Sequence, residues 1–170
     1  NPTQAYLNAM RVAFGRRGVK IERAPLDIDA VRMAPDMSTA TLLVEDNSPT
    51  VAELIDVALK WSRNIYAETL LRSIAPDGAP KSAAGGLKEL ASTLNTWGIF
   101  GEYFLARDGS GLSRYDYVTT DALTWLLTYM WMDPNHADRY RASLPEFSTS
   151  GTAANRLKNT PASGRVWAKT

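Results

Sequence analysis

The short polar triplet Ser62-Arg63-Asn64 lies between two amphipathic helical patterns, one before it and one after it. This arrangement constrains the fold most strongly. Apolar residues recur at helical spacing on both sides of it: Leu54, Ile55, Ala58, Leu59 and Trp61 before it, and Ile65, Ala67, Leu70, Leu71 and Ile74 after it. Ser and Asn are unfavourable inside helices, because their side chains compete for backbone hydrogen bonds. We therefore expect a turn between two helices that presents a hydroxyl and an amide together. The alternative is a simple junction, in which Ser62 ends one helix and Asn64 caps the next.

The first of these helices has two candidate starts. Ser48 followed by Pro49 is a helix-start pattern, because proline fits the first helical position. Thr50 with Glu53 three residues later is another, because the two residues can form a reciprocal capping box. The sequence leaves both starts open.

The composition is that of an ordinary globular chain and excludes several functional classes. With 170 residues, of which 45% are hydrophobic and 22% charged, the chain is one domain or part of one and can bury a core. A net charge of +1 gives no reason to expect nucleic acid or an anionic membrane as a partner. No apolar run is long enough for a transmembrane segment, and no signal peptide is recognisable in this chain. The oligomeric state stays open.

Cysteine and histidine usage narrows the possible chemistry. The chain has no cysteine, so disulfides and thiolate sites are excluded. Its one histidine, His136, cannot by itself form a metal site or a Ser-His-Asp triad. Its place just after Asp133-Pro134 indicates a loop near a helix start. We predict no metal site and no cofactor.

The rest of the chain alternates helical patterns with short strand-like runs. Helices are expected from residue 1 to a stop at Gly18, over 87–97 with a stop at Gly98, from 119 to the break at Asp133-Pro134, and briefly over 149–157. Strands are expected at 19–22, 39–44, 103–106 and 164–170. Stretches 24–35 and 76–80 indicate loops. Because the last strand pattern runs to the final residue, we expect the chain to be a fragment.

Segment 107–114, with the sequence Arg-Asp-Gly-Ser-Gly-Leu-Ser-Arg, is rich in turn residues. Gly109 and Gly111 permit backbone conformations that are closed to other residues. The polar side chains of this segment could line a site or simply solvate a loop.

Three segments, taken in order, resemble a known family. They are Ser62-Arg63-Asn64, the segment from Asp108 to Arg114, and Gly164-Arg165-Val166-Trp167-Ala168-Lys169-Thr170. Singly, Ser-x-Asn and Lys-Thr are weak motifs, but the ordered set is specific. The chain resembles the C-terminal part of a penicillin-binding protein of the D-alanyl-D-alanine carboxypeptidase/endopeptidase type, the penicillin-binding protein 4 family. The resemblance covers nearly the whole chain.

The resemblance implies an α/β fold of the β-lactamase/transpeptidase type, with an antiparallel sheet, packed helices and a helical lobe that carries Ser62. The family has three motifs: Ser-x-x-Lys, Ser-x-Asn and Lys-Thr-Gly. Ser62-Arg63-Asn64 matches the second and Lys169-Thr170 matches the start of the third, whereas no lysine here has a serine three residues before it. We therefore expect residues 1–170 to be part of one penicillin-binding domain that lacks the nucleophile segment.

The chemistry explains why such a site needs these groups. A serine hydroxyl is a weak nucleophile until a base takes its proton, and without a histidine the lysines must act. Two close ammonium groups repel, and repulsion together with desolvation can keep one of them neutral. The resemblance implies that Lys169 is one of the two lysines and that Ser62 relays a proton to the leaving D-alanine nitrogen. Asn64 would bind the peptide and orient the lysine.

The resemblance also implies substrate-binding residues. Thr170, with Lys169, would receive the terminal carboxylate of the substrate. Arg114 would line the pocket for the stem-peptide side chain together with Gly111 and Leu112, because an arginine fork suits a carboxylate. Oxyanion stabilisation would come from backbone N–H groups outside this chain.

The function implied is that of a serine-type D-Ala-D-Ala carboxypeptidase/endopeptidase that binds penicillin and acts on peptidoglycan stem peptides through an acyl-enzyme. Stem peptides and β-lactams would be its ligands, and its location would be extracytoplasmic, in the periplasm. Residues 1–170 alone are expected to be inactive. The alternatives are a serine β-lactamase or esterase of the same fold, or a non-catalytic peptidoglycan-binding module.

Simpler interpretations of the same residues remain. Lys169 and Thr170 could be ordinary solvent-facing strand residues, and Arg114 could be a surface charge. Trp61 and Trp97 occur at helical spacing with aliphatic residues, so we expect core positions for them rather than a ligand platform.

Overall fold

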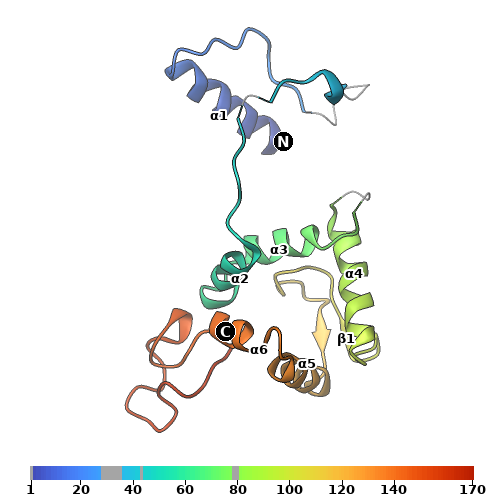
Figure 1. The fold of residues 1–170 in the computed structure, drawn as a ribbon, viewed down its shortest axis with the longest axis vertical. Helices are drawn as coiled ribbons and strands as arrows, with labels where there is room; N and C mark the ends of the chain where they lie inside the picture. The colour runs from blue at the N-terminus through green and yellow to red at the C-terminus, as the bar shows by residue number, and fades with distance from the viewer. Residues whose placement is uncertain (1, 28–35, 43, 78–80) are drawn as a thin grey trace. The chain divides into compact units, whose positions relative to one another are not determined.

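The computed structural model describes residues 2–27, 36–42, 44–77 and 81–170, and these residues form two compact units. The first unit comprises residues 1–47 and the second residues 48–170 (Figure 1). The expectation of a single penicillin-binding domain stays a prediction. The predicted loops 24–35 and 76–80 are irregular where they are described, and their residues 28–35 and 78–80 lie outside the described part.

The first unit contains helix α1, Pro2–Arg16, and the short 3-10 turn η2, Met37–Thr39. The predicted stop at Gly18 is confirmed, because Gly18 N–H donates to Gly15 and Val19 N–H donates to Phe14, which closes the helix end. No residue of α1 is buried.

Neither strand predicted for the first unit is present among its described residues. Residues 19–22 are irregular, and so are 40–42 and 44, while Leu43 lies outside the described part. A β-strand needs a neighbour to pair its N–H and C=O groups, and no described residue supplies one here. The apolar and β-branched sequence pattern alone was therefore not enough to produce a strand in these two segments.

The second unit is built on two helices joined by a sharp turn. Helix α2, Val51–Lys60, packs against α3, Asn64–Ser73, and α3 packs in turn against α4, Ala83–Thr96 (Figure 1). Helix α5, Thr120–Met132, packs against α6, Ala137–Ser143, which also contacts α2. Among the described residues, the buried apolar side chains are small or aliphatic: Ala58, Leu71, Ala75, Ile99, Ala122, Leu144, Pro145 and Ala153.

Local capping fixes where these helices begin and end. Of the two candidate starts for α2 the second is correct, since Thr50 and Glu53 form the capping box. The predicted start of α5 is confirmed: Thr119 caps it by accepting from Ala122 N–H at 3.1 Å. Helix α4 ends at Thr96 with Trp97 as its C-cap, and the predicted stop Gly98 follows with a φ of +81°. His136 occupies the N-cap position of α6, as its loop position predicted.

Strand structure in the second unit is sparse. The strand predicted at 103–106 is confirmed as β1, Phe104–Leu105, which pairs antiparallel with β2, Tyr117–Val118. The predicted helix over 149–157 shrinks to the 3-10 turn η3, Gly151–Ala153. The strand predicted at 164–170 is reduced to one bridge between Trp167 and Glu146, because the described chain offers it only a short irregular neighbour.

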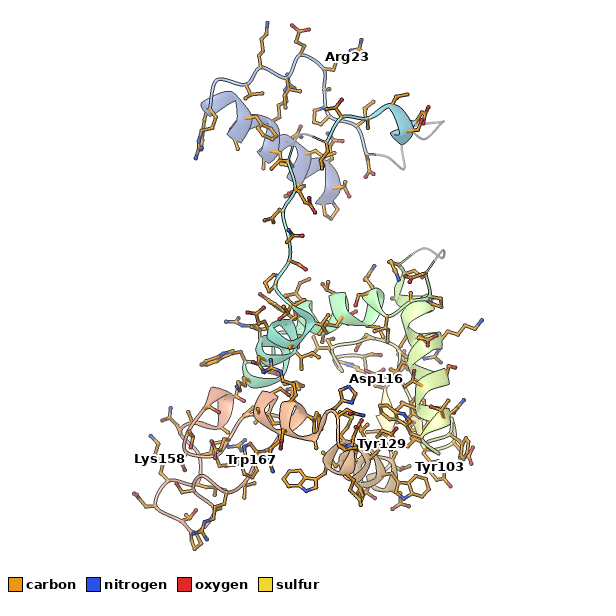
Figure 2. All side chains as sticks on the ribbon, in the orientation of Figure 1. Arg23, Tyr103, Asp116, Tyr129, Lys158 and Trp167 are labelled. Atoms are coloured by element: carbon orange, nitrogen blue, oxygen red, sulfur yellow. The ribbon has the colours of Figure 1, made fainter. Side chains whose placement is uncertain are left out.

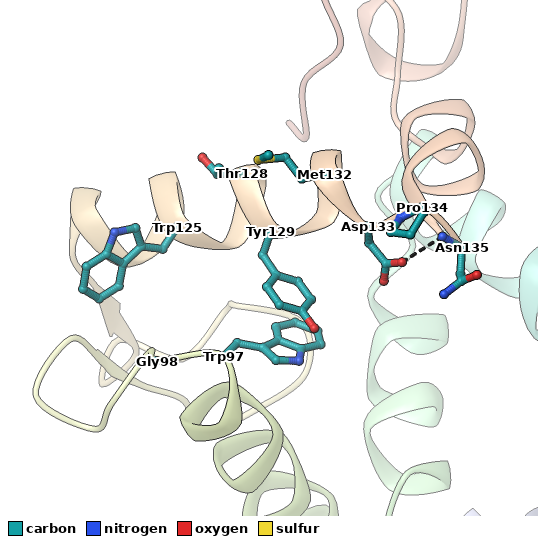
Figure 3. Close-up of a pocket in the computed structure, with 9 residues that line it drawn as sticks. All are labelled: Trp97, Gly98, Trp125, Thr128, Tyr129, Met132, Asp133, Pro134 and Asn135. Carbon is teal, nitrogen blue, oxygen red and sulfur yellow. Dashed lines mark hydrogen bonds between the residues drawn. The ribbon is translucent and has the colours of Figure 1, made fainter.

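An aromatic hollow of about 680 Å³ lies where the end of α4 faces α5 (Figure 3). The rings of Trp97 and Tyr129 stack there with centroids 4.3 Å apart. Trp97 is half-buried and lines this hollow, so it stacks on Tyr129 but does not occupy the expected core position. Trp61 also lies outside the core: it is 57% exposed, because α2 ends just before it at Lys60.

The contact of α4 with α3 predicts a clear substitution effect. A Cβ placed on Gly86 would lie 1.9 Å from the carbonyl oxygen of Leu71, on α3. Alanine is a better helix former than glycine by about 1 kcal/mol, but here the clash outweighs this gain. We expect Gly86→Ala to lower the free energy of unfolding by about 1–3 kcal/mol, measured by denaturant titration.

Gly101→Ala is the matched control, because a Cβ at Gly101 would meet no atom within 4 Å. Its stability should stay within about 0.5 kcal/mol of the unsubstituted protein. Equal stability of the two variants would contradict the packing of α3 against α4 described here.

Candidate active site

Ser62 lies in a tight turn between α2 and α3. Its backbone has a φ of +52°, in the left-handed region that non-glycine residues seldom adopt. The expected turn between two helices is therefore present, and the backbone strain at Ser62 is of the kind that clusters at functional sites. Asn64 is the first residue of α3, and Arg63 holds the N-cap position without a side-chain hydrogen bond. The junction in which Asn64 caps the helix is wrong.

The tertiary structure brings Lys169 to Ser62, although Lys169 lies 107 positions later in the chain. The Nζ of Lys169 donates to Ser62 Oγ at 2.7 Å, and Ser62 Oγ donates to the carbonyl oxygen of Thr170 at 3.1 Å. Lys169 Nζ also contacts that carbonyl oxygen. The three residues thus form one connected network, in which Ser62 both accepts and donates a hydrogen bond.

The electrostatic state of Lys169 is shifted by this position. The residue is exposed overall, but the groups around Nζ displace part of its hydration. This desolvation lowers the pKa of Lys169 below its ordinary value, because burial disfavours the charged form. A lysine that releases its proton more readily, next to a hydroxyl, can take part in proton transfer.

Backbone hydrogen bonds fix the position of the segment that carries Lys169. Phe147 N–H donates to the carbonyl oxygen of Val166 at 2.9 Å, and Ala168 N–H donates to that of Pro145 at 3.0 Å. The guanidinium of Arg141 lies 5.1 Å from the ring centroid of Trp131 and 5.8 Å from that of Trp167. Trp167 is labelled in Figure 2. These contacts hold the approach to Lys169 against α5 and α6.

The turn-rich segment 107–114 is tied to the same helix that begins at Asn64. One carboxylate oxygen of Glu68, on α3, accepts from the backbone N–H groups of Gly109 and Ser110, each at 3.0 Å. A Cβ on Gly109 would lie 2.7 Å from the carbonyl oxygen of Ala67, so a glycine is needed for this close approach. The loop is thus a fixed part of the site's framework.

Asp108 closes the loop on itself. Its carboxylate accepts from Gly111 N–H at 2.5 Å and from Ser113 N–H at 2.8 Å. Burial raises the pKa of Asp108, but these backbone donors outweigh it and hold the pKa below its ordinary value. Asp108 therefore stays ionised, and its carboxylate holds the loop closed through these two backbone hydrogen bonds.

The predicted substrate-binding residues of this loop face solvent. Gly111, Leu112 and Arg114 are exposed, Leu112 at 72%. Within the described chain, no hydrogen bond or ion pair links them to Ser62 or Lys169; the link runs through Glu68 and α3. The structure thus unites Ser62, Lys169 and Thr170, and leaves the role of Arg114 a prediction.

Sequence reasoning missed two residues of this framework. Glu68 was not identified as the anchor of the loop, and Thr152 was not identified beside Thr170, whose hydroxyl lies 2.5 Å from that of Thr152. A glutamate on a helix and a threonine in a turn carry no signal by themselves.

The described residues include no group of three or more His, Asp or Glu side chains that could hold a metal ion. None of the helices they form is long and apolar enough to cross a membrane.

Comparisons with known proteins show the family of this chain. Residues 2–170 match the D-Ala-D-Ala carboxypeptidase 3 (S13) family. The chain is 39% identical over 132 residues to a penicillin-sensitive carboxypeptidase A from Dictyostelium discoideum, covering 72% of this chain and 24% of that protein. It is 33% identical over 150 residues to a D-alanyl-D-alanine carboxypeptidase from Actinomadura sp. (strain R39), covering 85% of this chain and 28% of that protein. The chain thus spans about a quarter of the length of these relatives.

The fold also has a solved counterpart. Penicillin binding protein 4 from Haemophilus influenzae, complexed with a β-lactam, matches with a TM-score of 0.82 and 28% identity over 99% of this chain and 38% of that one. The predicted fold of the penicillin-binding protein 4 family is confirmed, here as helices with a small antiparallel sheet.

The anchoring of the loop predicts the effect of Glu68→Gln. A charged acceptor makes stronger hydrogen bonds than a neutral one by about 1 kcal/mol, so the amides of Gly109 and Ser110 should exchange their hydrogens about five- to tenfold faster. Amide hydrogen exchange measures this directly. Glu89→Gln on α4 removes the same charge away from the loop and should leave both rates unchanged. Unchanged exchange in Glu68→Gln would contradict the anchor.

Proposed function

Because this chain belongs to the D-Ala-D-Ala carboxypeptidase 3 (S13) family, we propose that it forms part of a penicillin-binding serine D-Ala-D-Ala carboxypeptidase/endopeptidase. The substrates are peptidoglycan stem peptides, and β-lactams acylate the same site. The single observation that carries this proposal is the 2.7 Å contact of Lys169 Nζ with Ser62 Oγ. It joins two of the three motif segments in one hydrogen-bonded network.

The nucleophile of the proposed reaction is a serine outside residues 1–170, since no lysine here follows a serine at the required spacing. Its Oγ attacks the carbonyl carbon of the penultimate D-alanine and its proton passes to a basic group. The peptide bond then breaks, and Ser62 delivers a proton to the departing nitrogen while receiving one from Lys169. Water then attacks the ester and its proton returns to Lys169, while the serine oxygen leaves with the proton that the basic group had taken, which regenerates the serine. Ser62 is therefore the relay and Lys169 its proton partner.

The charge of Lys169 suits this role in two ways. Its lowered pKa eases proton transfer to Ser62. In the complete protein a second lysine from the Ser-x-x-Lys motif would bring a further positive charge, and the two would favour one neutral amine. While protonated, Lys169 also attracts the terminal carboxylate of the substrate, which Thr170 binds through its hydroxyl.

Other residues of the proposed site act in binding. Asn64, at the exposed start of α3, hydrogen-bonds the peptide and orients the lysine of the nucleophile segment. Gly111, Leu112 and Arg114 line the region for the stem-peptide side chain, on a loop held rigid by Glu68 and Asp108. The proposed location is extracytoplasmic, in the periplasm, where peptidoglycan is accessible.

The proposal is tested by penicillin labelling. The complete protein, incubated with a labelled penicillin, should form a covalent adduct that mass spectrometry places on a serine outside residues 1–170. Residues 1–170 alone should form none, because a catalytic unit loses most of its rate without its nucleophile. A long-lived adduct indicates a peptidase, whereas rapid turnover would indicate a β-lactamase. An adduct on Ser62 would make Ser62 the nucleophile and overturn its role as relay.

Substrate preference should depend on Arg114. In the complete protein, Arg114→Ala should weaken binding of peptides that carry a side-chain carboxylate by about 1–3 kcal/mol, because a charged hydrogen bond is lost. Peptides without that carboxylate should be nearly unaffected. Steady-state kinetics on both peptides measures the difference. Equal losses on the two would show that Arg114 has a structural role only.

A further inference from the structure

We propose that Thr152 is a positioning residue of this site, which acts by orienting the hydroxyl of Thr170 toward the carboxylate of the ligand. The inference rests on the proposed function. The 3-10 turn that carries Thr152, Gly151–Ala153, would hold the Ser62 turn and the Lys169–Thr170 segment in register.

The turn is firmly anchored in the fold. Ala153 is completely buried, and its carbonyl oxygen accepts from Ser148 N–H at 3.1 Å. Ser150, just before the turn, accepts from Glu146 N–H at 3.1 Å through its hydroxyl. Glu146 also forms the bridge with Trp167, two residues before Lys169. The turn and the segment carrying Lys169 are therefore fixed to the same residue.

Gly151 places the turn against the end of α2. A Cβ at Gly151 would lie 2.4 Å from the carbonyl oxygen of Lys60, so the backbones meet where no side chain fits. Its φ of +57° also favours glycine. Lys60 is the last residue of α2, and Ser62 follows two positions later. One side of the turn thus sets the position of the Ser62 loop.

The other side of the turn reaches Thr170. The hydroxyl oxygens of Thr152 and Thr170 lie 2.5 Å apart, and the carbonyl oxygen of Thr170 accepts from Ser62. Thr170 therefore contacts both the turn and the proposed relay. Because the Thr152 side chain is exposed, its hydroxyl is not required for core packing.

The number of protons on each group determines the direction of the hydrogen bonds between Thr152, Thr170 and the carboxylate. Each hydroxyl has one proton to donate and can also accept. A carboxylate only accepts, so Thr170 must donate its proton to it. Thr170 is then left as the acceptor from Thr152, and the chain runs from Thr152 to Thr170 to the carboxylate. Successive hydrogen bonds in such a chain polarise one another. Thr152 thereby selects the rotamer of Thr170 that faces the ligand.

Two variants of the complete protein test this role. Thr152→Val keeps the shape and removes the hydroxyl, whereas Thr152→Ser keeps the hydroxyl. We expect Thr152→Val to raise KM for a D-Ala-D-Ala peptide about three- to tenfold with little change in kcat, since a binding hydrogen bond is weakened. Thr152→Ser should restore KM to within about twofold. The thermal midpoints of both variants should match that of the unsubstituted protein.

The possible results are distinguishable. If Thr152→Val leaves KM unchanged, or if Thr152→Ser is as impaired as Thr152→Val, the positioning role is wrong. The positioning role is also wrong if the loss of activity appears in kcat alone, or if both variants have a lowered thermal midpoint. Either result leaves the proposed function standing. If the unsubstituted complete protein neither cleaves the peptide nor binds penicillin, the proposed function itself fails.

Discussion

Helices α2 and α3, which are joined by the turn at Ser62, are approached at three points by the backbone of a glycine. Gly151 meets the carbonyl oxygen of Lys60, Gly109 meets that of Ala67, and Gly86 meets that of Leu71. At each point a Cβ would lie closer than 3 Å to the carbonyl oxygen, so the approach depends on glycine. The three contacts dock the η3 turn, the 107–114 loop and α4 onto one helix pair. The rest of the second unit is arranged around it.

This close docking determines the chemistry that the site can perform. Glu68 and Asp108 fix the loop through backbone N–H donors, so the carboxylates hold backbone rather than substrate. In the turn between α2 and α3, Ser62 meets Lys169 and has an unusual backbone conformation. The Ser62 hydroxyl and Lys169, whose pKa is lowered, are thus held together by contacts of the surrounding backbone.

The sequence predicted the helices well and most of the strands poorly. The helices could be predicted from the sequence because their backbone hydrogen bonds form within one segment of the chain. Caps such as Thr50 with Glu53, and Thr119, are also local signals. The strand patterns at 19–22, 39–44 and 164–170 produced at most the bridge at Trp167, since a strand also needs a partner, and pairing is a non-local property. Trp61 was misplaced for a related reason: helical spacing continued past the residue where the turn begins.

By itself, then, the sequence determined the helical framework, the turn at Ser62-Arg63-Asn64 and, through the order of its motifs, the family. These properties follow from local propensity and from residues that can be read one segment at a time. The resemblance already implied that Lys169 and Ser62 act together, and the tertiary structure shows the contact that joins them. Only the tertiary structure decided that Glu68 holds the 107–114 loop and that Thr152 stands beside Thr170. Each of these contacts joins residues that lie far apart in the chain or that carry no motif. Their geometry depends on how closely the backbones can pack, which no local pattern encodes.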